Sequence, residues 1–147
     1  MESLGRYIGR EIRLVMSFED SAEVPALAVD GAVVLVWLNQ LYFPNSRVSP
    51  LFKRLVSRSP LALLLGGSGA CEAFDVVLRL LADVDCNAKH TMTKWSPEPM
   101  VDCVSELLQS TWPADERFDE WVAYAIACDE RDADAIRRAT SQALHAG

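Results

Sequence analysis

The sequence predicts a three-layer α/β fold, in which a mostly parallel sheet of about five strands carries helices on both faces. Residues 32–38 and 61–65 are continuously apolar, as in strands that are covered on both faces. Strand-like and helical segments alternate from residue 32 onward, which is the pattern of parallel strands joined by crossover helices. The length of 147 residues matches one domain, so we expect residues 1–147 to form a single α/β unit.

The first two strands differ in how well their direction is defined. Residues 12–18 are apolar and rich in branched side chains, which predicts a first strand. Residues 19–31 contain Pro25 and Gly31 without helical periodicity, so the direction of this strand stays open. Residues 32–38 lack any polar side chain and are predicted to form a central strand.

The middle of the chain contains the clearest strand-turn-helix unit. Ser49 and Pro50 predict the start of a helix over residues 50–58, with the serine as its N-cap. The strand over residues 61–65 ends at four small residues and is followed by a helix over residues 70–85, with Ser68 as its expected N-cap. The four small residues are Gly66, Gly67, Ser68 and Gly69.

The last third continues the alternation. Residues 90–95 alternate polar and apolar side chains, which predicts a strand toward a sheet edge. Ser96 and Pro97 repeat the cap signal, before a helix that we expect to end near Trp112. Residues 121–128 are strand-like, and a terminal helix follows from Asp129 with its inner face at Ile136, Ala139, Ala143 and Leu144.

This order of elements is typical of the Rossmann- and flavodoxin-like class of topologies. Such sheets bind ligands outside the carboxyl ends of their strands. Any site is therefore expected in the loops after Leu38, Leu65, Trp95 and Cys128.

The charge balance argues against nucleic acid as a partner. Fourteen basic and 21 acidic residues give a net charge of −7, whereas binding to a phosphate backbone requires a basic face. Residues 59–147 hold 7 basic and 15 acidic residues, and much of the acid falls between residues 115 and 134. This acidic stretch has two interpretations, a solvated face with helix caps or a docking surface for a basic partner.

The sequence predicts a cytoplasmic protein without membrane, metal or cofactor. No uninterrupted apolar run approaches the roughly 20 residues that span a bilayer, and the N-terminal residues carry interleaved charges unlike a secretory signal. The cysteines form no C-x-x-C pair, and two histidines are too few for a His-rich metal centre. We interpret the cysteines Cys71, Cys86, Cys103 and Cys128 as reduced thiols.

The glycine-rich turn is the candidate site for small-molecule chemistry. Its small-x-Ser-x-small pattern between a strand and a helix resembles the setting of a nucleophile elbow, which makes Ser68 a candidate nucleophile with His90 or His145 as the base. Alternatively, the backbone N–H groups of residues 66–69 cradle an anion such as phosphate. Glu72 and Asp75 in the following helix oppose an anion, and a purely structural turn is the simplest interpretation.

A second candidate site is an interaction surface. Its residues are the two tryptophans and four carboxylates at the end of the third helix, namely Trp112, Asp115, Glu116, Asp119, Glu120 and Trp121. The basic segment of Arg47, Lys53, Arg54 and Arg58 has the complementary charge for contact with a second copy. The sequence thus favours a non-catalytic protein-interaction module or homodimer over an enzyme, with a ligand-binding or hydrolase-like site at the glycine turn as the alternative.

Overall fold

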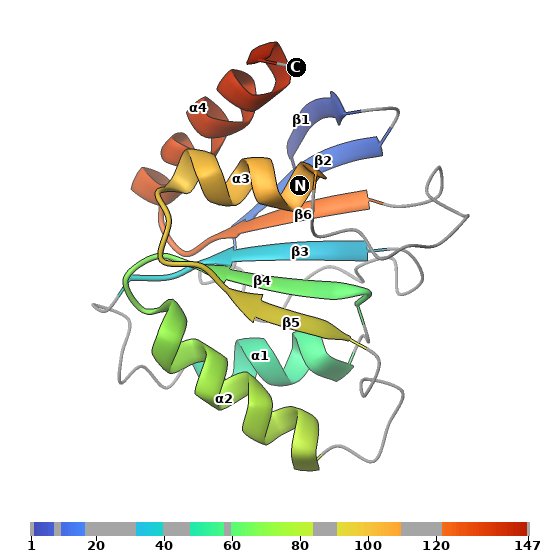
Figure 1. The fold of residues 1–147 in the computed structure, drawn as a ribbon, viewed down its shortest axis with the longest axis vertical. Coiled ribbons are helices and arrows are strands. Elements are labelled where there is room, and N and C mark those ends of the chain that lie inside the picture. Colours follow the sequence, from blue (N-terminus) through green and yellow to red (C-terminus); the bar gives the residue numbers. More distant parts are fainter. Residues whose placement is uncertain are drawn as a thin grey trace.

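The structure, a computed structural model, describes residues 2–7, 10–16, 32–39, 48–57, 60–83, 91–109 and 122–146. These residues form a three-layer α/β fold in which one mixed sheet lies between two groups of helices (Figure 1). The predicted fold class is confirmed.

The sheet has six strands in the described part of the chain, in the order β1-β2-β6-β3-β4-β5. Their bounds are β1 Glu2–Tyr7, β2 Arg10–Met16, β3 Ala32–Trp37, β4 Ala62–Gly66, β5 Met92–Trp95 and β6 Val122–Ala127. All strands from β2 to β5 in this order pair in parallel, whereas β1 is antiparallel to β2. The structure therefore settles the direction of the first predicted strand, and it confirms a central β3 and a β5 at the edge.

Strand β1 is a correction to the sequence-based expectation of about five strands. Its residues are mostly exposed or half-buried and show no apolar alternation, so local pattern gave no strand signal. The pairing with β2 shifts register between Ser3 and Gly5, and Gly5 has a φ of 128°. A β-bulge of this kind places a residue that tolerates positive φ where the strand bends.

The helices cover both faces of the sheet, as predicted. Helices α1 (Val48–Ser57) and α2 (Ala70–Asp83) lie on one face, and α3 (Met100–Gln109) and α4 (Glu130–Ala146) on the other (Figure 1). The expected inner face of the terminal helix is confirmed, because Ile136, Ala139 and Ala143 are buried and Leu144 packs against the same core. None of these helices combines the length and apolar character needed to cross a membrane.

The predicted serine caps are wrong at three helix starts. Helix α1 already includes Val48, so Ser49 lies in its first turn. The first N–H donor of α2, on Ala73, reaches the carbonyl of Gly69, which takes the N-cap position from Ser68. Helix α3 begins after Pro99, whose carbonyl accepts from Cys103, while the Ser96 hydroxyl accepts from the N–H of Glu98 at 3.2 Å.

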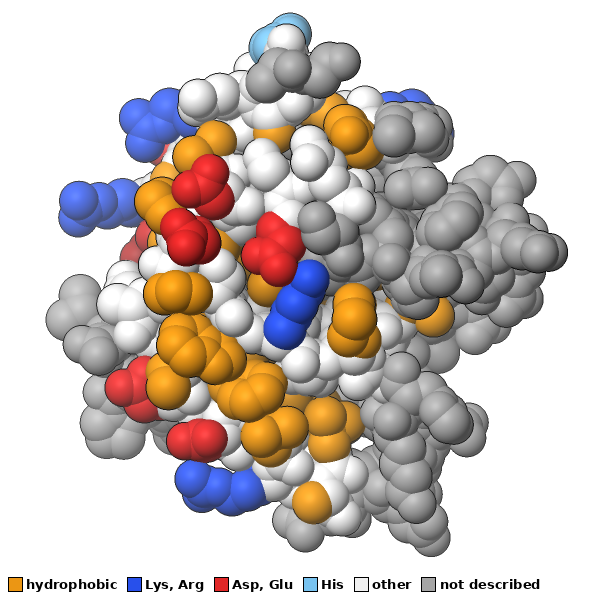
Figure 2. Space-filling view, in the orientation of Figure 1, with side chains coloured by type: hydrophobic (Ala, Val, Ile, Leu, Met, Phe, Trp, Pro, Cys, Tyr) orange, Lys and Arg blue, Asp and Glu red, His pale blue; other side chains and the backbone are white. Residues whose placement is uncertain are grey.

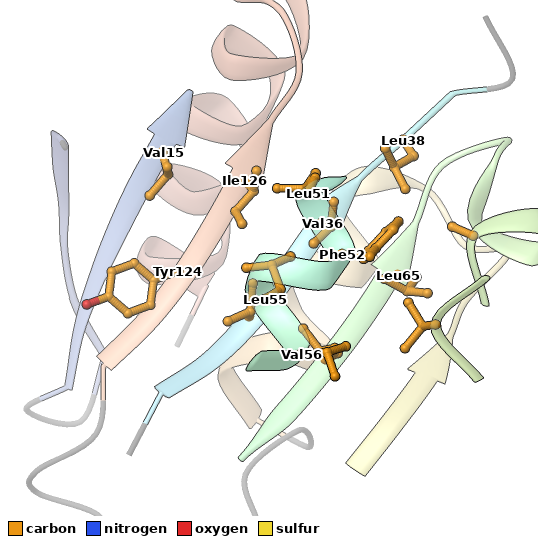
Figure 3. Close-up of a cluster of buried hydrophobic side chains, with 14 of the residues drawn as sticks. Val15, Val36, Leu38, Leu51, Phe52, Leu55, Val56, Leu65, Tyr124 and Ile126 are labelled. Carbon is orange, nitrogen blue, oxygen red and sulfur yellow. The ribbon is translucent and has the colours of Figure 1, made fainter. Parts of the chain in front are cut away.

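The core lies on both sides of the central strands because their successive side chains point to opposite faces. Val34 and Val36 of β3 pack with α1 and α2, whereas Val33 and Leu35 pack with α3. Figure 3 shows the first cluster, in which Phe52 of α1 lies among side chains of β3 and β4. Continuous burial of β3 and β4 explains why both strands are apolar without alternation.

Candidate functional site

The carboxyl edge of the parallel strands contains a topological switch point. The chain leaves β3 toward α1 on one face, whereas it leaves the adjacent β6 toward α4 on the other. Divergent connections of this kind open a crevice where α/β proteins bind ligands. Trp37 ends β3 at this place and is followed by Leu38 and Asn39, and Cys128 and Asp129 follow β6.

The glycine-rich turn after β4 lies beside the switch point and is fastened to the end of β3. The N–H of Leu38 donates to the carbonyl of Gly66 at 2.9 Å, and the N–H of Gly69 donates to the carbonyl of Leu38 at 3.2 Å. Gly67 has a φ of 93°, and a Cβ at this position would lie 1.8 Å from the Leu38 carbonyl oxygen. Only glycine fits between the turn and the neighbouring backbone.

Gly66 has a different packing role. A Cβ at Gly66 would lie 2.8 Å from the Trp37 ring and 3.2 Å from the Cys103 sulfur. The turn therefore sits against side chains of both β3 and α3. Two of its three glycines are required by neighbours within the protein, which supports the structural interpretation of this motif.

Two N–H groups at the end of the turn are engaged within the protein and are not available to an anion. The N–H of Gly69 is used by Leu38, and the N–H of Ala70 donates to the Gly67 carbonyl at 3.1 Å. Glu72 and Asp75 are exposed in the first turns of α2, where they complement the helix dipole and repel negative charge. These contacts weaken the anion-binding alternative.

Ser68 is exposed at the tip of the turn. His145 lies near the end of α4, a helix that starts at the carboxyl edge and runs back along the sheet for 17 residues. At about 1.5 Å per residue, this helix leads away from the carboxyl edge: Leu144, the neighbour of His145, lies next to Gly5 of β1, which pairs with Ile12 near the amino end of β2. The structure therefore does not bring Ser68 and His145 together, and His90 lies outside the described residues.

Cys128 at the switch point is a buried thiol. Its sulfur donates to the Trp37 carbonyl at 3.7 Å, which connects the ends of β6 and β3. Burial raises the pKa of the Cys128 thiol, and the carboxylates of Asp132 and Asp129 raise it further. A thiol held in its neutral form is a poor nucleophile, so Cys128 contributes packing.

The described part of the acidic stretch serves helix α4. The Asp129 carboxylate accepts from the N–H of Asp132 at 2.8 Å, and its carbonyl accepts from Ala133. Asp134 and Glu130 form ion pairs with Arg137, which also binds Glu2 of β1. A cap and local ion pairs thus account for three acidic residues of this stretch, Asp129, Glu130 and Asp134. The predicted interaction residues Trp112, Asp115, Glu116, Asp119, Glu120 and Trp121 lie outside the described residues, as do Arg47 and Arg58 of the basic segment.

Neither a group of metal ligands nor similarity to a known protein indicates an activity. Within the ranges that the structure describes, no three His, Cys, Asp or Glu side chains are grouped so that they could hold a metal ion. No protein-family model matches the chain, and no curated protein matches it.

Sequence reasoning missed an apolar surface at the β5 edge. Among the described residues, the large hydrophobic side chains that are exposed are Leu78 at 44%, Trp95 at 41% and Met92 at 39%. Phe74 and Leu81 are half-buried on α2, which contacts β5. We call Phe74, Leu78, Leu81 and Trp95 the β5–α2 surface. Met92 pairs with Ala62 of β4 and points to the other face of the sheet, toward α3. Figure 2 shows hydrophobic side chains gathered over this part of the molecule.

The sequence carried a signal for this surface. Helix α2 carries the exposed Leu78 in addition to the apolar residues that pack against the core, which include Val76. An amphipathic helix with one buried side requires only a single apolar stripe. Leu78 is the apolar position of α2 that exceeds this requirement.

Proposed function

We propose that this protein is a protein-interaction module that binds its partner through the β5–α2 surface. The observation that carries the proposal is that two exposed large hydrophobic residues, Leu78 and Trp95, belong to contacting elements and lie on the same face at one edge of the sheet. Single exposed apolar residues are ordinary, whereas contiguous ones are typical of binding surfaces.

The edge position of β5 supports this function. Strand β5 pairs with β4 on one side only within the described sheet. Its one charged residue, Lys94, forms an ion pair with Glu106 of α3 at 2.9 Å. Because Lys94 is paired with α3, it protects the exposed edge of β5 against pairing with another strand less than a lysine that projects into solvent.

The direction of the Lys94 side chain shows on which face of the sheet Trp95 lies. Lys94 points toward α3, so its neighbour Trp95 points to the opposite face of the sheet, which α2 covers. Trp95 and Leu78 therefore present apolar area on the same side of the edge. Large, rigid tryptophan side chains are frequent at the centre of protein interfaces.

The alternative, a ligand or hydrolase-like site at Gly66, Gly67, Ser68 and Gly69, has weaker support. Contacts to Leu38, Trp37 and Cys103 explain the glycines. The predicted acidic docking surface remains a further part of the proposal, on residues that the structure does not describe.

Site-specific photo-cross-linking tests the function. A photoreactive phenylalanine analogue at Leu78 is expected to give discrete protein adducts in cells, and the same analogue at exposed Gln142 of α4 serves as the matched control. Adding Trp95→Glu to the Leu78 probe should remove the adducts. Equal labelling from positions 78 and 142 would contradict the proposal.

A further inference from the structure

We infer that the partner at the β5–α2 surface is a second copy of this chain, docked about a twofold axis with the two α2 helices antiparallel. The inference rests on the proposed function and names its partner. The inference depends on the charged residues beside the apolar centre of the surface. A twofold rotation brings the acidic residue of each copy opposite the basic residue of the other.

Helix α2 carries an acidic residue before Leu78 in the sequence, Asp75, and a basic residue after it, Arg79. Asp75 and Arg79 are both exposed and lie four residues apart, so they project from the same side of the helix one turn apart. No ion pair of the described residues involves either side chain. Both charges are thus available to a partner.

An antiparallel copy of the same helix satisfies both charges. With the twofold axis near the turn between Asp75 and Arg79, each aspartate lies opposite the arginine of the other copy. Leu78 of one helix then lies near Leu78 of the other, with Phe74 and Leu81 beside it. The arrangement joins an apolar centre to two equivalent ion pairs at its rim.

The local charge balance permits self-association in spite of the net charge of −7. On α2, Asp75 is balanced by Arg79, which leaves Glu72 as the unbalanced charge among the side chains of this helix that the structure describes. Lys94 points to the other face of the sheet and is neutralised there by Glu106. Two such surfaces repel each other little when they meet. A strongly acidic or strongly basic partner has no comparable complement here.

Sedimentation equilibrium of the purified full chain tests the inference. The wild-type protein is expected to form a dimer whose population rises with protein concentration. Leu78→Glu should weaken the dimer at least about a hundredfold, because two unpaired carboxylates meet at its centre. Since Leu78 is exposed, circular dichroism of this variant should match that of the wild type.

Charge reversal tests the antiparallel arrangement. Asp75→Arg and Arg79→Asp should each weaken the dimer by about tenfold, since each replaces two attractive pairs with two repulsive ones. The double variant restores opposite charges across the axis and should recover the wild-type affinity. Arg138→Asp on α4 is the matched control, because it makes the same charge change at an exposed helical position on the other face of the sheet.

The outcomes separate the inference from the function. A monomer at all concentrations, or a dimer indifferent to Leu78→Glu, overturns the second copy as partner, while adducts of other mass in the cross-linking experiment still support an interaction module. Failure of the double charge variant to recover affinity overturns the antiparallel geometry. Recovery in the double variant, with no effect of Arg138→Asp, supports the dimer described.

Discussion

Replacing Gly67 with alanine is expected to destabilise the fold by about 3–4 kcal/mol. A non-glycine residue at positive φ costs about 1–2 kcal/mol, and Gly67 has a φ of 93°. The added Cβ would also lie 1.8 Å from the Leu38 carbonyl oxygen, which is a backbone atom, so the turn itself must move.

Movement of the turn adds to the conformational strain. It stretches the two hydrogen bonds between Leu38 and the turn, at 2.9 Å to Gly66 and 3.2 Å from Gly69. Each such bond contributes about 1 kcal/mol net. The combined loss is a large part of the roughly 5–15 kcal/mol that stabilises a typical domain.

Urea unfolding followed by tryptophan fluorescence measures this loss. With a slope near 2 kcal/mol per molar urea, the midpoint should fall by roughly 1.5–2 M. Gly66→Ala is the graded comparison, because its Cβ meets the movable Trp37 side chain and should cost about 1–2 kcal/mol. Ser68→Ala, at the exposed tip, should cost at most about 1 kcal/mol.

A Gly67→Ala variant within about 1 kcal/mol of the wild type would refute the reasoning. It would show that the turn can leave Leu38 without loss, and that the glycines are not explained by packing. Because the assay contains no ligand, a large loss also separates a structural role of the turn from a binding role.

Three further predictions concern other parts of the fold. Because burial raises the pKa of the Cys128 thiol, the folded protein keeps this proton at pH values where the unfolded chain, with a thiol pKa near 9.0, loses it. The free energy of unfolding should therefore fall as pH rises above about 9, by up to ~1.4 kcal/mol per pH unit. Cys128→Ala should flatten this slope, whereas Cys71→Ala, at an exposed cysteine, should leave it unchanged. Thr140→Val should raise the free energy of unfolding by about 1 kcal/mol, because the Thr140 hydroxyl is buried without a partner, and a lower value in urea unfolding would contradict this. Glu2→Gln should speed hydrogen exchange of β1 amides at low salt by weakening the contact with Arg137, and an effect that persists in about 1 M salt would argue against an electrostatic cause.

The sequence predicted most elements because burial is visible in local pattern. Strands β3 and β4 are covered on both faces and therefore continuously apolar, and the terminal helix showed its inner face at Ile136 and Ala139. Strand β1 escaped prediction for the opposite reason. Its residues are largely exposed, and its pairing with β2 depends on backbone hydrogen bonds that any side chain permits.

The candidate sites were harder to predict because their meaning depends on neighbours. The glycine turn had the spacing of a nucleophile elbow, yet the carbonyl of Leu38 and the ring of Trp37 explain its glycines. The sequence predicted that β5 lies toward a sheet edge but singled out neither Leu78 nor Trp95 as exposed. Their exposure on one side of this edge depends on how α2 packs against β5, which is a tertiary contact.

The sequence by itself determined the alternation of strands and helices, the two-sided burial of the central strands and the charge of −7, since each of these is a property of residues close together in the chain. Tertiary structure alone decided that β6 inserts between β2 and β3, where Leu14 pairs with Ala125. It also decided that the turn after β4 closes on Leu38 and that Leu78 of α2 and Trp95 of β5 are exposed. A parallel strand can pair equally well beside several others, so its place is chosen by how the helices pack over both faces, and that choice depends on contacts between residues far apart in the chain.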